Sequence, residues 1–368
     1  MKVVQFVPSL DSGGVEQGVI EIAKALVEDN HESHVVSSGG RLVDDLISSG
    51  SHHHKWDLGK KSLLNLRLIK PLRNWIVSTQ PDIIHVRSRM PAWLVWKALN
   101  GIPQSQRPQL VSTVHGLHSV NFYSRVMTKP HNIIAVSQSS KNYIIDNYTK
   151  SENKNIKLIY RGVDSSNYNK DYAPSDKWLS DWYEQYPETK SAKLLTISGR
   201  ISPLKDIEKI IHLAKSIKDN SSHNFKILIA GEAQNKHLKY LKNLKNTIKY
   251  LGLSEDIYFL NFRKDIKDIY AISSLAFNTS NKPESFGRSV LEPLSMGVPT
   301  IGYNRGGVKE ILDELYPFGG VTPGSDEQLL NKTLCILDGN EANIKTNTKF
   351  ITSKMCSETL SFYKEILS

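Results

Sequence analysis

Short apolar segments alternate with helical patterns along this chain, and this alternation constrains the fold more than any other feature. It predicts an α/β protein in which helices cover both faces of a mostly parallel sheet. The segments that we expect to form strands are Lys2–Pro8, Ser33–Ser37, Asp82–Val86, Gln109–Thr113, Asn132–Val136, Asn155–Ile159, Lys193–Ser198, Phe225–Ala230, Ile257–Leu260, Leu275–Asn278 and Val298–Gly302. Apolar residues at helical spacing predict helices over Gly14–Glu28, Asp206–Lys218, Lys236–Leu251 and Arg288–Met296.

The alternation is interrupted between residues 165 and 190. This stretch is rich in Tyr, Asp, Asn, Pro and Ser, and we interpret it as a linker with a short helix near Trp178–Tyr183. The 368 residues therefore predict two doubly wound, Rossmann-like domains, over 1–170 and 171–350, and a last amphipathic helix over 351–368 that crosses back to the first domain. Ligands bind at the carboxyl ends of strands in such sheets. We therefore expect the domains to face each other across a cleft that holds the site.

The net charge of +10 is concentrated in the first half of the chain. Residues 1–170 hold 21 Lys and Arg against 13 Asp and Glu, whereas residues 171–368 hold 26 against 24. A basic surface favours anionic partners such as phosphorylated sugars or acidic lipid. The chain shows no zinc finger, basic zipper or RNA-binding signature, so we expect no nucleic-acid partner. The two cysteines offer no disulfide framework, which favours a reducing compartment. The sequence also shows no targeting segment and no apolar run long enough to span a membrane. We therefore expect a cytoplasmic protein.

The strongest motif is PESFGRSVLEPLSMGVP, over residues 283–299, which follows the strand expected at Leu275–Asn278. Gly287 allows the backbone to approach a ligand closely, and the helix expected to begin there offers its first-turn amides to a phosphate or to sugar hydroxyls. Glu284 lies before this helix and Glu292 inside it. Each Glu taken singly fits an ordinary solvated residue, but a loop carboxylate and a helix carboxylate together fit two parts of one sugar-containing ligand.

This motif resembles the signature of retaining glycosyltransferases of family 4, which have the GT-B fold. Both have two Glu separated by seven residues, around a Phe-Gly and ahead of a Gly-x-Pro. The resemblance implies that Glu284 contacts the donor sugar, that Glu292 contacts the ribose of its nucleotide, and that Leu291 lies near the base. It also implies that the donor sugar or its phosphates meet the backbone around Ser285, Phe286 and Gly287.

A second segment, TISGRISPLKD over residues 196–206, resembles the Gly-Arg of the same family, which is followed five residues later by Lys. The resemblance implies that Arg200 and Lys205 clamp the donor diphosphate. Negative charge develops on the diphosphate as it leaves, so the enzyme must supply either a metal or fixed cations. The chain contains no Asp-x-Asp, and we expect no metal and no cofactor besides the nucleotide-sugar substrate. Where the family usually has Gly after the Lys, this chain has Asp206.

Weaker similarities to the family occur elsewhere. Gly231 follows the strand expected at Phe225–Ala230, and Arg263 falls where family members line the base pocket, although a surface loop is an equal interpretation. In the first half, Gly13 and Gly14 form a turn whose backbone suits an anion and which resembles the loop that approaches the donor phosphates.

Two further strand ends in the first half carry basic or titratable residues. His115 ends one expected strand, and the resemblance implies that it contacts the donor sugar near the reacting centre. Arg87 and Arg89 end another strand, where they fit either an anionic acceptor or a solvated loop. His52–His54 is expected at a strand edge.

Residues Lys60–Val77 combine apolar side chains at helical spacing with Lys and Arg. Such a helix either lies on anionic lipid or packs on the core with one wet face. The sequence leaves both interpretations open.

These observations predict a metal-independent retaining glycosyltransferase. We expect it to transfer a hexosyl or related group from a nucleotide-diphosphate sugar, such as a UDP-sugar, to a cell-envelope glycan or lipid-linked acceptor. Lipopolysaccharide core at the inner face of the plasma membrane is the acceptor implied by the resemblance. Two alternatives remain open: a nucleotide-sugar epimerase of the same architecture, which uses no acceptor, and a non-catalytic nucleotide-sugar-binding protein.

Overall fold

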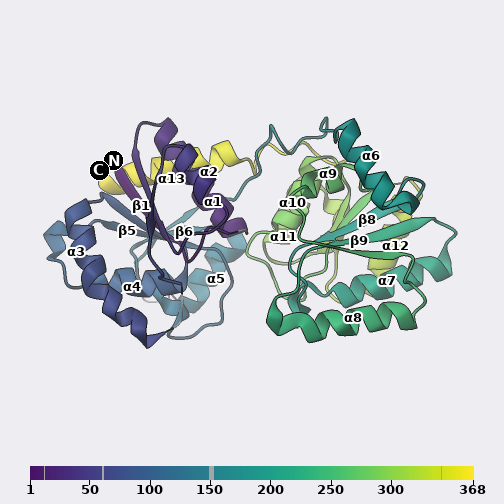
Figure 1. Cartoon of the computed structure of the whole chain (residues 1–368), viewed down its shortest axis with the longest axis horizontal. Coiled ribbons are helices and arrows are strands. Elements are labelled where there is room, and N and C mark those ends of the chain that lie inside the picture. The colour runs from purple at the N-terminus through teal and green to yellow at the C-terminus, as the bar shows by residue number, and fades with distance from the viewer. Residues whose placement is uncertain (12, 60–61, 149–152, 341) are drawn as a thin grey trace. The chain divides into compact units, whose positions relative to one another are not determined.

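The computed structural model of the chain divides into two compact units (Figure 1). It describes residues 1–11, 13–59, 62–148, 153–340 and 342–368. The first unit comprises Met1–Gly162 and Thr352–Ser368, and the second comprises Val163–Ile351. The division after Gly162 falls earlier than the one that we predicted after residue 170, because Val163 already pairs with Ile351 of the second unit.

The first unit is built on a sheet of seven parallel strands in the order β3-β2-β1-β4-β5-β6-β7. These strands are β1 (Lys2–Phe6), β2 (Glu32–Ser37), β3 (His52–Lys55), β4 (Ile83–Val86), β5 (Gln109–Val114), β6 (Asn132–Ala135) and β7 (Asn155–Leu158). The order reverses direction between β1 and β4, which makes this the topological switch point of a doubly wound sheet.

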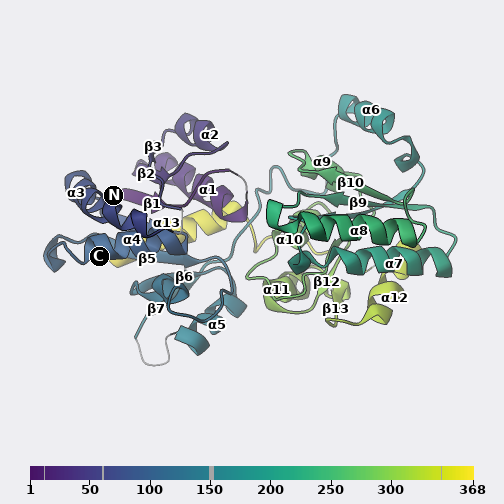
Figure 2. The ribbon, with the colours of Figure 1, turned by 60° about the horizontal axis from the view of Figure 1, so that its bottom comes forward.

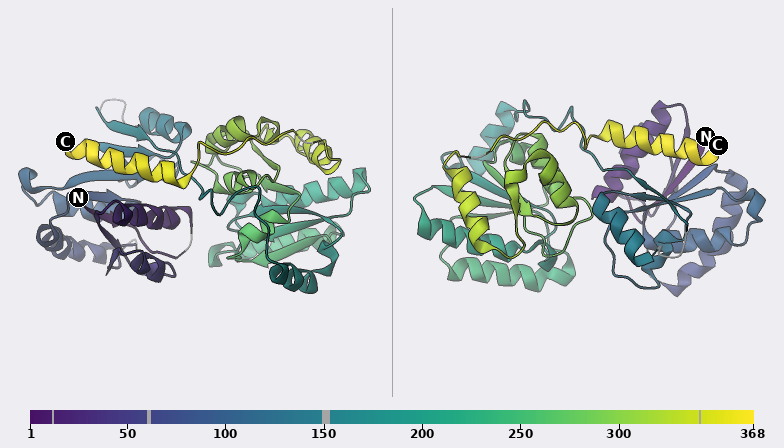
Figure 3. Two further views of the ribbon diagram at one scale, coloured as in Figure 1. Left: turned by 90° about the horizontal axis from the view of Figure 1, so that it is seen from above. Right: turned by 180° about the vertical axis from the view of Figure 1, so that it is seen from behind.

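Helices cover both faces of this sheet. One face carries α1 (Gly14–Glu28), α2 (Val43–Ser48) and α13 (Thr352–Leu367). The opposite face carries α3 (Ile69–Thr79), α4 (Arg89–Leu99) and α5 (Gln138–Tyr148). Figure 1 shows α13 and α4 on opposite sides of the sheet. Figure 3 follows α13 along the first unit, where its residues Phe362 and Tyr363 are fully buried in the core.

The segment Lys60–Val77 does not form one continuous amphipathic helix. A 3-10 helix, η1, spans Leu63–Leu68 before α3 begins, while Lys60 and Lys61 lie outside the described residues. Leu72 and Ile76 of α3 are buried in the core against α4 and the sheet. The apolar face of α3 is therefore used for packing, which favours the core interpretation over the lipid one.

The second unit repeats the architecture with six parallel strands in the order β10-β9-β8-β11-β12-β13. They are β8 (Lys193–Ser198), β9 (Phe225–Ala230), β10 (Ile257–Asn261), β11 (Leu275–Asn278), β12 (Thr300–Tyr303) and β13 (Gly320–Val321). The switch point lies between β8 and β11.

Two groups of helices cover the second sheet. One core lies under α7 (Ile207–Asn220), α8 (Leu238–Tyr250) and α12 (Asp326–Leu337), which Figure 2 shows together. The remaining helices are α6 (Asp176–Gln185), α9 (Ile266–Ala271), α10 (Arg288–Ser295) and α11 (Gly306–Leu315). α6 is longer than the short helix that we predicted, because Ser175 caps its first turn and Trp182 is buried against β8 and β9.

Among the described residues, no helix is both long and apolar enough to cross a membrane.

Candidate active site

Two loops meet at the switch point of the second unit. One follows β8 and carries Arg200 and Lys205, and the other follows β11 and carries Glu284. The Nζ atom of Lys205 lies 2.7 Å from Oε1 of Glu284 although the residues are 79 positions apart in the chain. The carboxyl ends of neighbouring parallel strands thus bring together the residues of two separate motifs, at the edge where doubly wound sheets bind ligands.

Glu284 is held by three donors. Besides Lys205, the side-chain amide of Asn278 donates to Oε1 at 3.1 Å, and the hydroxyl of Ser280 donates to the same oxygen. Burial alone would raise the pKa of Glu284, but the charge of Lys205 and these hydrogen bonds outweigh it and lower the pKa below its ordinary value. The carboxylate is therefore ionised at neutral pH and ready to accept hydrogen bonds from sugar hydroxyls.

The backbone around Glu284 is fixed by close contacts with the start of α11. The amide of Gly307 donates to the carbonyl of Glu284 at 2.8 Å. Gly306 has a φ of +61°, and a Cβ there would come within 2.5 Å of the same carbonyl oxygen. The loop thus depends on two glycines that the sequence motif itself does not include.

Helix α10 begins as the motif predicts. Gly287 precedes it with a φ of +123°, a conformation that residues with a Cβ rarely adopt. Ser285 and Gly287 frame the start of the helix, whereas Phe286 turns inward and stacks edge-on against Phe350. The first hydrogen bonds of the helix run from the amides of Val290 and Leu291 to the carbonyl of Gly287, so only the amides before Val290 are placed at the helix start, where an anionic group is favoured.

The two cations of the β8 loop differ in their surroundings. Lys205 forms an ion pair with Glu284. Arg200 is exposed, and its side chain has no partner among the described residues. Gly231 supports this loop, because a Cβ at that position would lie 1.9 Å from the carbonyl oxygen of Gly199. Asp206 has φ 48° and ψ 48°, which explains why Gly suits this position in the family that the motif resembles.

The helix carboxylate and its neighbours are less accessible. Glu292 accepts a hydrogen bond at 2.8 Å from Nε of Arg288, one helical turn earlier. Leu291 has an exposed fraction of 0 %, so its side chain lies in the core. Arg263 is paired with Asp265 through two hydrogen bonds and lies over the ring of Trp182, so the structure does not bring it to Glu284.

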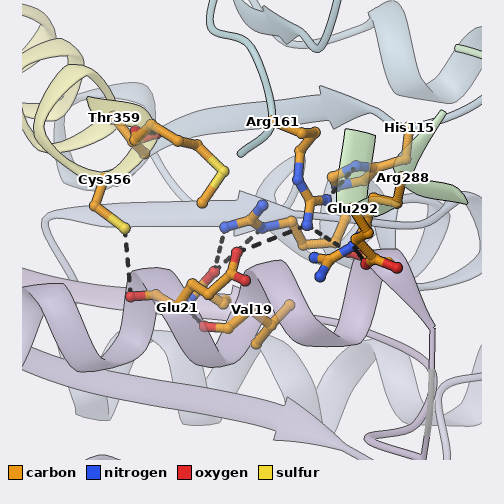
Figure 4. Close-up of polar contacts among 12 residues, drawn as sticks. Val19, Glu21, His115, Arg161, Arg288, Glu292, Cys356 and Thr359 are labelled. Atoms are coloured by element: carbon orange, nitrogen blue, oxygen red, sulfur yellow. Dashed lines mark hydrogen bonds and ion pairs between the residues drawn. The ribbon is translucent and has the colours of Figure 1, made fainter. Parts of the chain in front are cut away.

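A second cluster surrounds His115 at the carboxyl end of β5 in the first unit. Nη1 of Arg161 lies 3.4 Å from Nδ1 of His115, and the same guanidinium donates to the carbonyl of Gly14 and lies 3.8 Å from Glu21 (Figure 4). The structure therefore joins the Gly13-Gly14 turn to His115 through Arg161. We did not predict Arg161, although its place just after the strand β7 is the signal that singled out His115.

Burial lowers the pKa of His115 well below its ordinary value, and the nearby charges of Arg161 and Arg87 lower it further. The imidazole is therefore neutral at pH 7, so it can exchange hydrogen bonds with a hydroxyl but adds no positive charge. A cavity of about 10 Å³ lies among Arg87, His115, Arg161 and Thr359, roughly the space of one water molecule.

The two arginines at the end of β4 have different environments. Arg87 is buried and donates from Nε and Nη2 to the side-chain oxygen of Gln5, at 3.1 and 2.5 Å. It is thus part of the interior of the first unit. Arg89 is partly exposed and lies over the ring of Tyr123, so only Arg89 is presented at the surface.

Among the described residues, no group of three or more His, Cys, Asp or Glu side chains is placed to hold a metal ion.

Two family models match the chain in succession. Residues 12–167 match the model described as Glycosyltransferase Family 4, and residues 180–352 match the model described as Glycosyl transferases group 1. With the two parallel sheets, these matches show that the protein is a glycosyltransferase of the GT-B fold. More particularly, the chain belongs to the family 4 glycosyltransferases.

Similar proteins match the chain over nearly its whole length or over half of it. N-acetyl-alpha-D-glucosaminyl L-malate synthase of Bacillus anthracis is 24 % identical over 98 % of this chain and 95 % of its own length. The O-antigen biosynthesis glycosyltransferase WclY of Escherichia coli is 25 % identical over 50 % of this chain and 46 % of its own length.

Solved structures show the same fold. A glycosyltransferase from Rickettsia africae ESF-5 superposes with a TM-score of 0.84 at 25 % identity, covering 100 % of this chain and 98 % of the other. Alr3699/HepE of Anabaena, solved in complex with UDP-glucose, superposes with a TM-score of 0.82 at 23 % identity, covering 99 % of this chain and 100 % of the other.

Proposed function

We propose that this glycosyltransferase is a retaining, metal-independent enzyme that transfers a hexosyl group from a nucleotide-diphosphate sugar. The Lys205–Glu284 pair at the switch point of the second unit is the observation that carries the proposal. It sets a fixed cation beside an ionised carboxylate, where the first can bind a diphosphate and the second a sugar. UDP-sugars are the first candidates, since the similar Anabaena protein is solved with UDP-glucose.

In the proposed reaction, the bond between the anomeric carbon and the phosphate oxygen breaks, and its electron pair stays on the diphosphate. Arg200 and Lys205 stabilise that charge. The acceptor oxygen bonds to the anomeric carbon on the face that the diphosphate leaves, and the acceptor proton passes to the departing phosphate oxygen. Glu284 orients the sugar, and Glu292, once released from Arg288, receives the ribose hydroxyls.

We assign His115 a binding role toward a donor hydroxyl. Its pKa is held low by burial and by Arg161 and Arg87, so it acts as a neutral hydrogen-bonding group. A positively charged imidazole is not needed, because the cations of the second unit already stabilise the leaving group.

The acceptor that we propose is a cell-envelope glycan or a lipid-linked sugar, with lipopolysaccharide core as the first example. Support comes from the basic first half of the chain and from the similarity to an O-antigen glycosyltransferase over half of the chain. One relative is named N-acetyl-alpha-D-glucosaminyl L-malate synthase. We therefore add malate, a small dicarboxylate, to the acceptors to be tested.

The test has two stages. A panel of nucleotide-sugars is first screened for protection of the full chain against thermal unfolding, because a ligand that binds the folded state raises Tm. With the best donor, nucleotide release is then measured for the wild type and for Lys205→Ala, with and without EDTA. We expect Lys205→Ala to lower turnover by about 100-fold or more, and EDTA to have no effect.

The matched control is Lys215→Ala, which removes an exposed lysine paired with Asp219 on α7. Equal turnover for Lys205→Ala and Lys215→Ala would refute the proposed clamp. Strict dependence on a divalent cation would refute metal independence, and conversion of the donor without nucleotide release would favour an epimerase.

A further inference from the structure

Two large apolar side chains of the first unit are turned to the solvent in the loop after β5. Phe122 has an exposed fraction of 77 % and Val120 of 55 %. Both lie within eight residues of His115, on the loop that leaves the carboxyl end of the strand. Exposed apolar side chains that gather in one place mark a surface that meets a partner.

This loop is fixed by hydrogen bonds and ring contacts, so its apolar side chains are held in the solvent. The indole Nε1 of Trp93 on α4 donates to the carbonyl of Tyr123 at 2.9 Å, and the rings of Trp93 and Phe122 lie 5.1 Å apart. The amide of Ser124 donates to the side chain of Asn121 at 2.8 Å. The hydrogen bonds hold the residues on both sides of Phe122, and a turn of its ring away from the solvent would break the contact with Trp93.

Cations surround the aromatic side chains. Trp96 lies 5.5 Å from Trp93, and the ammonium groups of Lys97 and Lys129 lie over its ring at 5.2 and 5.7 Å. Arg89 lies over the ring of Tyr123 at 5.1 Å. The segments 89–99 and 117–129, which supply all these residues, contain no Asp or Glu. We call this surface the aromatic-basic patch; it comprises Arg89, Trp93, Trp96, Lys97, Val120, Phe122, Tyr123 and Lys129.

We propose that the aromatic-basic patch binds the first unit to an anionic lipid surface. Trp and Phe are favoured at the boundary between lipid headgroups and acyl chains, and lysines beside them contact anionic headgroups. The most exposed apolar side chains of the patch, Val120 and Phe122, offer no hydrogen-bonding group to a sugar but can enter the acyl-chain boundary of a lipid layer. Charge complementarity thus favours lipid as the occupant.

The patch replaces the Lys60–Val77 segment as the proposed membrane contact, because Leu72 and Ile76 of that segment are buried. The inference goes beyond the proposed reaction and does not depend on it, since lipid binding needs neither donor nor acceptor. Val120 and Phe122 of the patch lie in the loop that follows His115, so binding would bring a lipid-linked acceptor to the same end of the sheet.

The experiment measures co-sedimentation of the full chain with vesicles. One set contains phosphatidylcholine alone, and the other mixes it with phosphatidylglycerol, at low and high salt. We expect binding only to the anionic vesicles, weakened by salt. Phe122→Ser should lower the partition coefficient about tenfold, and Lys97→Gln with Lys129→Gln should lower it about fivefold for each charge removed.

Matched control variants come from the second unit. Tyr250→Ser removes a ring that is 88 % exposed, and Lys245→Gln removes a cation that lies over Phe259; neither should change binding. A further pair, Leu66→Ser and Val77→Ser, tests the exposed side chains of η1 and α3.

Three outcomes would overturn the proposal. The wild type could fail to bind anionic vesicles, or binding could depend on Leu66 and Val77 and not on Phe122. The patch variants could also change the sedimentation coefficient of the protein alone, which would identify the surface as a contact between copies of the chain. Unfolding temperatures of all variants confirm that differences in binding do not come from misfolding.

Discussion

At the scale of single residues, the loops of the second unit that carry Arg200, Lys205 and Glu284 depend on glycines for space. Gly231 carries no functional atom, yet it faces the carbonyl of Gly199 so closely that a methyl group would collide with it. The loop next to it carries both Arg200 and Lys205. A substitution of Gly231 therefore displaces Arg200 and Lys205 by moving the backbone of that loop.

We therefore predict that Gly231→Ala lowers nucleotide release more than it lowers stability. The added Cβ would lie 1.9 Å from a backbone oxygen, so the loop after β8 must shift. A displacement of about 1 Å at reacting groups can cost about 100-fold in rate. Steady-state nucleotide release and urea unfolding are measured on the same preparation.

The control is Gly252→Ala, in a turn where φ is +67° and no atom lies within 4 Å of the new Cβ. This variant should lose about 1 kcal/mol of stability through backbone strain and retain its activity. Equal activity losses in the two variants would contradict the role that we give to Gly231.

At the scale of secondary-structure elements, the edge strand β3 is unusual because histidines carry its packing. His34 of β2 stacks on His52 and on His54, and Nδ1 of His34 lies 2.8 Å from Nε2 of His54. Glu32 accepts from the other nitrogen of His34, and His53 contacts Ser37 on the opposite face of the sheet. The pair His34–His54 requires at least one neutral ring, since two imidazolium groups have no acceptor to share.

The pKa values of His34, His53 and His54 are lowered, in each case chiefly by burial. A lowered pKa in the folded state means that the unfolded chain binds protons more readily. The contribution to stability is therefore complete above the ordinary histidine pKa of about 6.5 and is lost as the pH falls through the folded-state values.

We predict that His54→Gln reduces this acid sensitivity. Urea unfolding midpoints at pH 8 and pH 5 should differ less in the variant than in the wild type, because one partly buried group no longer titrates. His212→Gln, at an exposed position on α7, should leave the difference unchanged. If the wild-type midpoint were the same at both pH values, the histidine packing would not be linked to protonation.

At the scale of the whole molecule, the two units differ in how the chain builds them. The second unit is one continuous segment, Val163–Ile351, with its own core under α7, α8 and α12. The first unit needs both ends of the chain, because α13 supplies buried residues such as Phe362 and Tyr363. Tyr363 also contacts the fully buried His85 of β4 through its hydroxyl.

We predict that residues 163–351 fold as an isolated fragment and keep a thermal shift with the donor nucleotide. Residues 1–162 alone should fail to unfold cooperatively, because the missing helix exposes the apolar face beneath it. Differential scanning calorimetry compares both fragments with the full chain. Addition of a peptide of residues 352–368 should restore a transition to the first fragment. A cooperative transition for residues 1–162 without that peptide would contradict the prediction.

Local patterns in the sequence were sufficient for much of the fold. The predicted bounds of α1, β8, β9 and β11 match the structure, because hydrophobic period and flanking Gly or Pro act within a few residues. Strands with polar sequences were harder to define: His52–His54 was expected only at a strand edge, whereas β3 pairs along its length with β2. Its stability comes from neighbours that a local pattern does not contain.

The sequence by itself determined the pattern of two successive α/β units, the motif around Glu284 and the segment that carries Arg200 and Lys205. Only the tertiary structure decided which of these side chains meet. It joined Lys205 to Glu284 across 79 positions and Arg161 to His115 across 46, while it buried Leu291 and paired Arg263 with Asp265. The physical reason is that a parallel sheet brings the carboxyl ends of distant strands to one edge. Proximity and burial there depend on strand order and packing, which no local pattern specifies.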